Sequence, residues 1–314
     1  MADRNLRIVF LGTPDFAVPS LTALVEAGYS VVGVFTQPDR PRDRGQRACS
    51  SPVKCAALGM GLPVFEFERI RRKEGVAALE ALQPDLMVTA AFGQILSQKV
   101  LDIPRHGCFN VHGSLLPKYR GPAPIQWAII HGETETGITI MKTDAGIDTG
   151  DMLLQRRTAI DPQENAGQLF ERLAALGAQA LLEALTALKA GTLVPTPQDH
   201  GAATHFPMLN KDDGRIDWNR SAADIHNQIR GVTPWPGAWT TLGGATVKIW
   251  RTTVGDAAIP PGHLVCSLKT GMAVGTGCGS IRVQEIQLPG KRRMSARDYL
   301  CGCRIAEGTV FDGY

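Results

Sequence analysis

The sequence lacks an apolar run long enough to cross a bilayer, because polar residues or glycine interrupt its longest apolar stretches. It also lacks a signal peptide. The first residues, MADRNLRIVFLG, place charges before an apolar run of strand length, and no cleavage-site pattern follows that run. These absences favour a cytoplasmic protein with no membrane partner.

Paired cysteines are also scarce. The chain has seven cysteines in 314 residues, an odd number that does not indicate a disulfide framework. Cys301 and Cys303 form one close pair, and no second pair or nearby histidine completes a zinc site. We therefore expect no structural metal and a reducing compartment.

A nucleophile motif and a strong charge excess are missing as well. There is no G-x-S-x-G motif and no cysteine in a recognisable nucleophile context, which disfavours a covalent acyl-enzyme. The net charge is +3, but residues 208–314 hold 13 Lys and Arg against 9 Asp and Glu, whereas residues 1–207 hold 20 against 21. A basic rear half indicates contact with a polyanion. A solvated surface would also explain so small an excess.

The first 190 residues alternate between strand-like and helix-like segments. The expected strands are residues 6–12, 30–36, 85–93 and 107–113, and the expected helices lie near residues 53–58, 75–82, 94–101 and 165–191. Thr13 is expected to cap a helix that begins at Pro14. Residues 133–160 are expected to form two strands joined by a turn rich in Gly and Asp. This alternation predicts an α/β fold with a Rossmann-like, mostly parallel sheet and helices on both faces.

The pattern changes after residue 190. Residues 191–207 contain prolines and threonines without a clear period, so we interpret them as a linker. Beyond them, brief strands alternate with glycine-rich turns, which predicts a small, OB-like β-barrel. The expected domains are therefore a catalytic domain over residues 1–190 and a C-terminal domain over residues 208–314.

The end of one expected strand carries chemistry. Asn110 and His112 are two residues apart, so they project from the same face, and both can donate a hydrogen bond to a carbonyl oxygen that gains negative charge. Asp148, on a glycine-flanked turn, could orient the imidazole. Three such residues without a nucleophile favour direct acyl transfer to an incoming amine. A strand end whose histidine bonds a neighbouring backbone group is the alternative explanation.

The segments NVHGSLLPKYRG and DAGIDTGD resemble the signature of the folate-dependent formyltransferases, which use 10-formyltetrahydrofolate as the donor. The resemblance implies that Asn110, His112 and Asp148 are catalytic. It also implies a loop that lines the folate site, which corresponds here to Ser114, Leu115, Leu116 and Pro117.

Further segments resemble the methionyl-tRNA formyltransferases within this family, from about residue 6 to 251: FLGTPDFAVPSL, TQPDRP, GPAPIQWAIIHGETETGITIM and RIDW with GVTPWPGAW. That resemblance implies transfer of the formyl group to methionine on initiator tRNA for translation initiation. Glycinamide ribonucleotide formyltransferases are shorter, whereas sugar-nucleotide formyltransferases share a small added domain. A non-catalytic tRNA-binding protein would have no need of all three catalytic positions.

The tRNA contacts expected from this resemblance are basic residues. Arg44 lies in the charged segment of residues 36–54 and matches the arginine of the family's RG step, while Arg42 and Asp43 depart from the pattern and keep open roles. The other candidates for contact with phosphates are Lys211, Lys291, Arg292 and Arg293. Trp218, Trp235 and Trp239 are expected to pack the core of the second domain rather than stack on bases. We expect a monomer.

Overall fold

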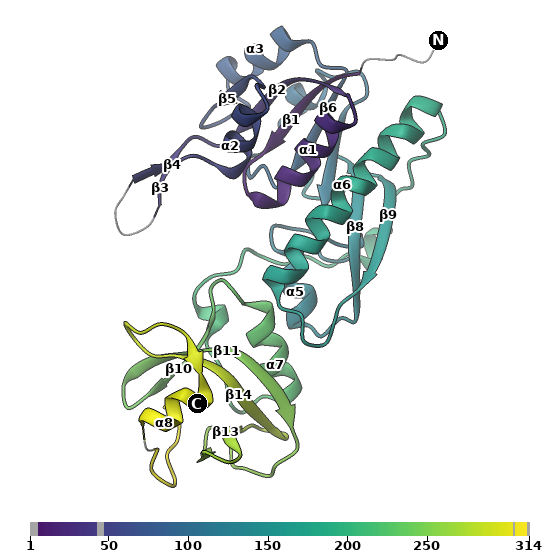
Figure 1. Cartoon of the computed structure of the whole chain (residues 1–314). Helices are drawn as coiled ribbons and strands as arrows, with labels where there is room; N and C mark the ends of the chain where they lie inside the picture. The colour runs from purple at the N-terminus through teal and green to yellow at the C-terminus, as the bar shows by residue number, and fades with distance from the viewer. Residues whose placement is uncertain (1–5, 43–46, 304, 313–314) are drawn as a thin grey trace. The chain divides into compact units, whose positions relative to one another are not determined.

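The structure is a computed structural model that describes residues 6–42, 47–303 and 305–312 (Figure 1). It divides into two compact units. Unit 1 consists of Met1–Pro124, Thr136–Thr158 and Phe170–Phe206, and unit 2 of Ile125–Glu135, Ala159–Leu169 and Pro207–Tyr314. The domain limits of 1–190, 191–207 and 208–314 stay a prediction, although residues 191–206 belong to unit 1.

Unit 1 is built on a seven-stranded sheet with the order β5-β2-β1-β6-β7-β8-β9. Its strands are β1 (Arg7–Gly12), β2 (Ser30–Thr36), β5 (Val64–Glu66), β6 (Leu86–Ala90), β7 (Cys108–His112), β8 (Glu135–Lys142) and β9 (Met152–Ala159). The pairs from β5 to β7 are parallel, and β8 runs antiparallel to β7. The carboxyl ends of β6 and β7 therefore meet at one edge, where a parallel sheet holds its ligands.

Helices cover both faces of this sheet. The helices of unit 1 are α1 (Val18–Glu26), α2 (Pro52–Gly59), α3 (Lys73–Leu82), α4 (Gln98–Leu101) and most of α6 (Ala166–Ala190). Cys108 of β7 packs in a buried cluster with Leu79 of α3 and Val100 of α4. On the opposite face, Val111 lies so close to Gly177 of α6 that a Cβ at that glycine would reach 2.7 Å from it. Because both faces are buried at the centre of the sheet, β1 and β6 are almost entirely apolar.

The predicted fold class is confirmed in its mostly parallel sheet with helices and its C-terminal β domain. Two local expectations in unit 1 were wrong or incomplete. The charged segment of residues 36–54 was expected to be a long loop, but it contains an antiparallel hairpin, β3 (Arg40–Arg42) and β4 (Arg47–Cys49), which extends from the sheet in Figure 1. Thr13 does not cap a helix, because its hydroxyl donates to Phe92 O at 3.0 Å. The strands of this hairpin are too short to show a sequence period, and the partner of Thr13 lies 79 residues away.

One described helix, α6, is long and apolar enough to cross a membrane by length and composition alone. In the structure, 44% of its most apolar window is buried. Core helices of globular proteins pass the same test, and α6 packs on the sheet through Gly177 and Ala180.

Unit 2 contains a six-stranded antiparallel sheet. Five of its strands follow the order β10-β11-β14-β13-β12, and the sixth, β15, pairs with β14. Its elements are β10 (Ala238–Leu242), β11 (Ala245–Gly255), β12 (Leu264–Ser267), β13 (Gly271–Gly275), β14 (Ser280–Gln287), β15 (Met294–Ser295), α7 (Ala222–Gly231), α8 (Ala296–Gly302) and most of α5 (Pro124–Ile130). Trp218 and Phe311 stack with ring centroids 5.3 Å apart in its core. Trp235 is 53% exposed, so the expectation that it packs the core was wrong.

Helix α7 buries two basic side chains. His226 Nε2 donates to Pro162 O at 3.2 Å, and its Nδ1 lies 2.9 Å from Thr252 Oγ1. Burial lowers the pKa of His226, and the nearby Arg230 charge lowers it further, whereas the bond to Pro162 raises it. Burial likewise lowers the pKa of Arg230, whose Nη1 donates to Asp161 O and Glu164 O.

The lowered pKa of His226 predicts acid sensitivity of unit 2. As the pH falls through the usual value of 6.5, the unfolded chain binds a proton that the folded chain does not, so the free energy of unfolding falls. In His226→Gln, whose amide can bond both partners, this fall should be smaller. The measurement is urea unfolding at about pH 7.5 and about pH 5.5, followed by tryptophan fluorescence, because all five tryptophans lie in unit 2.

The exposed His205→Gln serves as the control and should keep the pH dependence of the unaltered chain. An equal pH dependence in His226→Gln and the unaltered chain would contradict the prediction.

Candidate active site

Asn110 and His112 lie at the carboxyl end of β7, on the side of the strand that Cys108 shares. Asn110 is opposite Thr89 of β6, and the Thr89 hydroxyl donates to Asn110 Oδ1 at 2.9 Å. This bond fixes the amide orientation, so Asn110 Nδ2 must face the other way. His112 is opposite Thr139 of β8 and is only 6% exposed.

Asp148 reaches these two residues from the turn between β8 and β9. Asp148 Oδ1 lies 3.5 Å from Asn110 Nδ2 and 3.7 Å from His112 Nδ1. The structure therefore brings together the three residues that the sequence indicated as catalytic. Asp148 adopts a left-handed backbone conformation with φ of 52°, and a Cβ at the neighbouring Gly150 would clash with the carbonyl oxygen of Lys142. The turn has little freedom to adopt another shape.

Backbone groups of the segment after β7 complete the arrangement. Tyr119 O lies 3.0 Å from His112 Nε2, so the ring donates there and directs Nδ1 toward the carboxylate. Gly121 N donates to Asp148 Oδ2 at 2.8 Å. Each carboxylate oxygen thus faces a donor supplied by β7 or by the segment that follows it.

The predicted folate loop is largely occupied with its own structure. Ser114 is fully buried, and its hydroxyl donates to Lys118 O at 2.7 Å. Thr139 Oγ1 donates to Ser114 O, and Gln155 Nε2 donates to Leu116 O at 2.8 Å. Leu116 is buried, while Leu115 and Pro117 are half-buried. Among these four residues, Leu115 and Pro117 therefore have surface left for a ligand.

Two large apolar side chains are exposed in the loops that follow β6 and β8. Ile95 is 69% exposed in the loop after β6, and Ile147, beside Asp148, is 64% exposed. The β6 loop is held in place because Gln37 Nε2 donates to Phe92 O and Gly93 O, at 3.1 and 3.2 Å. Exposed apolar side chains beside a polar site are typical of surfaces that contact a flat ligand.

Sequence reasoning missed Thr89, which bonds Asn110, and Gln198, which bonds the turn that carries Asp148. It also missed Arg120, which bonds Gln198. Arg120 is part of the NVHGSLLPKYRG segment, so a role for its charge in the site could have been considered from the sequence. Gln198 stands in the segment interpreted as a linker, and no local pattern marks it.

The predicted tRNA residues are distributed differently. Arg44 lies outside the described residues. Lys211, Lys291, Arg292 and Arg293 are exposed on unit 2. The Arg293 guanidinium lies over the Trp250 ring, with its Cζ 3.6 Å from the centroid, and Gln287 Nε2 donates to Lys291 O. The turn that carries the three cations is therefore tied to β14.

The cysteine of β7 is fully buried. Burial raises the pKa of Cys108, two residues before Asn110, to about 12, so this thiol stays protonated. No group of three or more His, Cys, Asp or Glu in residues 6–42, 47–303 and 305–312 could hold a metal ion.

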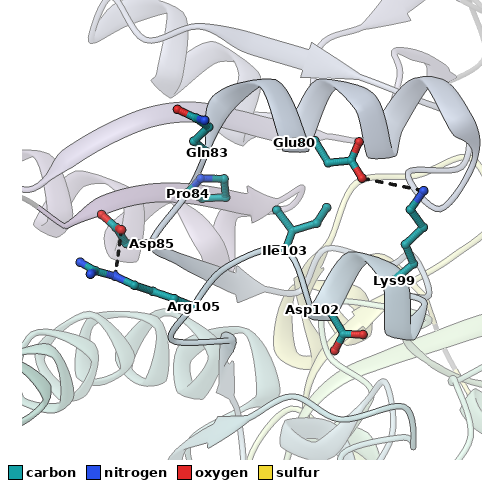
Figure 2. Close-up of a pocket in the computed structure, with 8 residues that line it drawn as sticks. All are labelled: Glu80, Gln83, Pro84, Asp85, Lys99, Asp102, Ile103 and Arg105. Carbon is teal, nitrogen blue, oxygen red and sulfur yellow. Dashed lines mark ion pairs between the residues drawn. The ribbon is translucent and has the colours of Figure 1, made fainter.

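A separate pocket of about 480 Å³ is shown in Figure 2. Its walls include Asp85 and Arg105, which precede β6 and β7, and their side chains pair at 3.0 Å. Because these residues precede their strands whereas Asn110 and His112 end theirs, the pocket lies at the opposite edge of the sheet. We do not assign the acyl-transfer chemistry to it.

Comparison with known proteins identifies the class first. A family model described as formyl transferase matches residues 6–185, and one described as the formyl transferase C-terminal domain matches residues 208–304. The chain belongs to the formyl transferase family.

Full-length relatives narrow this class. A Geobacter metallireducens protein named methionyl-tRNA formyltransferase is 52% identical over 304 residues, covering 97% of this chain and 98% of that protein. An Acetivibrio thermocellus protein of the same name is 48% identical over 308 residues, covering 97% of this chain and 99% of that protein. Within the formyl transferases, the chain belongs to the methionyl-tRNA formyltransferase family.

Solved structures share the fold at lower identity. WlaRD, described as a sugar 3N-formyl transferase in the presence of dTDP and 5-N-formyl-THF, has a TM-score of 0.66 at 19% identity, covering 91% of this chain and 99% of that chain. HypX from Aquifex aeolicus, in complex with tetrahydrofolic acid, has a TM-score of 0.62 at 18% identity, covering 94% of this chain and 47% of that chain.

Proposed function

We propose that this chain transfers the formyl group of 10-formyltetrahydrofolate to the α-amine of methionine on initiator tRNA, for translation initiation. The observation that carries the proposal is the meeting of Asn110 Nδ2 and His112 Nδ1 at Asp148 Oδ1, at 3.5 and 3.7 Å. The chain that contains these three residues is 52% identical to a protein named methionyl-tRNA formyltransferase.

The reaction needs no enzyme nucleophile. The lone pair of the amine attacks the formyl carbon, and the carbonyl π electrons move to oxygen. Asn110 donates a hydrogen bond to this oxyanion from Nδ2, and His112 donates from Nδ1, because its Nε2 already bonds Tyr119 O. Such donors accelerate acyl transfer where charge develops on oxygen. When the intermediate collapses, the folate nitrogen leaves with the bond electrons and takes a proton from His112, while the amine nitrogen gives its proton to solvent water. Asp148 orients the ring and stabilises the imidazolium.

The donor needs an apolar wall beside this trio. Leu115 and Pro117 keep exposed surface, and Ile95 and Ile147 are exposed in the loops that follow β6 and β8. We assign the pterin ring to this surface. The fully buried Ser114 and the buried Leu116 act instead by holding the loop in shape.

The acceptor is a polyanion, and exposed cations provide its binding surface. Lys211, Lys291, Arg292 and Arg293 supply such charges on unit 2. Arg44 is assigned by its position in the sequence alone. A reaction on charged tRNA belongs with translation, so we place the protein in the cytoplasm, and we propose that it acts as a monomer.

The acceptor is tested by offering three amines with 10-formyltetrahydrofolate: methionine-charged initiator tRNA, methionine-charged elongator tRNA and an amino-sugar nucleotide. We expect rapid transfer to the initiator tRNA and little to the others. His112→Gln should bind tRNA with unchanged affinity and lose transfer by about 100-fold or more. Transfer to the sugar alone would refute the tRNA acceptor, and tRNA binding without transfer by the unaltered chain would refute the enzyme.

The cationic turn is tested with Lys291→Ala/Arg292→Ala. If both side chains contact phosphates, the slope of log affinity for tRNA against log salt should decrease by about 2. The kcat should hold, because neither residue touches the reacting atoms. Lys269→Ala, an exposed lysine elsewhere on unit 2, is the matched control and should change neither quantity. An unaltered salt slope in the double variant would remove this turn from the tRNA site.

A further inference from the structure

The buried side-chain amide of Gln198 bonds to the backbone of the turn that carries Asp148. Gln198 is 5% exposed, and its Nε2 donates to Asp148 O at 2.9 Å and to Gly150 O at 2.7 Å. A primary amide has two N–H groups, so both are used on this turn. One of the two carbonyls belongs to Gly150, where a Cβ would clash with Lys142 O.

A buried arginine fixes which way this amide points. Arg120 is 6% exposed, and its Nε and Nη2 both donate to Gln198 Oε1, at 3.1 and 2.7 Å. If the amide were rotated by half a turn, its NH₂ would face the guanidinium and its oxygen would face two carbonyls. Both contacts would then be repulsive, so the guanidinium leaves one orientation for Gln198.

The residue that follows Arg120 bonds directly to the Asp148 carboxylate. Gly121, the residue after Arg120, donates its N–H to Asp148 Oδ2 at 2.8 Å. Arg120 itself is anchored, because its N–H donates to Thr204 O and its carbonyl accepts from Phe206 N. The backbone and the carboxylate of Asp148 are therefore positioned by two consecutive residues, one of which acts through Gln198.

We propose that Gln198 and Arg120 are positioning residues, which hold the Asp148 carboxylate against His112 and Asn110 without touching substrate. Nothing in their contacts requires them for binding the folate or the tRNA. Their loss should therefore reduce the rate of the chemical step, because a displacement of a catalytic group by about 1 Å can cost about 100-fold. This inference rests on the proposed formyl transfer.

The test measures formyl transfer by Gln198→Glu, which has the same shape but places an anionic oxygen against two carbonyls. We expect kcat to fall by about 100-fold, with the KM values for folate and tRNA within about 2-fold. Gln198→Met, which lacks both donors, should behave in the same way. Two controls should match the unaltered chain: Gln163→Glu, the same change at an exposed site, and His200→Ala, whose Nδ1 contacts Arg120 Nη2 but not the turn.

The role of Arg120 is separated by a double-mutant cycle. Because Arg120→Lys and Gln198→Glu act through the same amide, their combined loss of kcat should be smaller than the product of the single losses. Multiplicative losses would overturn the role of Arg120.

Values of kcat within about 2-fold of the unaltered chain in both Gln198 variants, or increased KM values at constant kcat, would overturn the inference. Absence of transfer by the unaltered chain would refute the proposed function instead, so the two failures are distinguishable.

Discussion

The contact between the Asp148 carboxylate and the polar end of β7 is the constraint on which the rest of the site depends. One oxygen faces Asn110 Nδ2 and His112 Nδ1, and the other accepts from Gly121 N. A carboxylate in such a partly buried position is stabilised only while these donors surround it. The left-handed backbone conformation of Asp148, together with Gly150 two residues later, gives the turn the shape that places the carboxylate among these donors.

The sheet makes this contact possible because one of its strands, β8, runs in the opposite direction to its neighbour β7. Parallel strands bring the ends of β6 and β7 to one edge, where Thr89 orients Asn110. Strand β8 runs antiparallel to β7, so the end of β8 lies beside the start of β7. The turn beyond β8 therefore approaches the site from that side. The segment that contains Gln198 returns to the back of that turn, where Thr196 pairs with Met152.

Sequence alone predicted the fold class, which depends on local patterns. It also named the three residues that the structure brings together at Asp148, through strand spacing and the resemblance to the formyltransferases. Apolar runs of strand length gave the sheet, and spacing placed Asn110 and His112 on one face of a strand. The sequence could not predict that Thr13 would bond Phe92 O, nor that Gln198 in an apparent linker would hold a turn 50 residues earlier. Such contacts are formed by tertiary packing and leave no periodicity. Trp235 shows the converse, since an apolar motif predicted burial and the side chain is exposed.

The central claim is that the negative charge of Asp148, and not only its shape, supports the transfer. Asp148→Asn keeps the size of the side chain and leaves an oxygen that can accept from Gly121 N. The decisive measurement is the single-turnover rate of formyl transfer to methionine-charged initiator tRNA by this variant. We predict a loss of at least about 100-fold, with folate and tRNA affinities retained. A rate close to that of the unaltered chain would show that the carboxylate is a structural element and contradict the account.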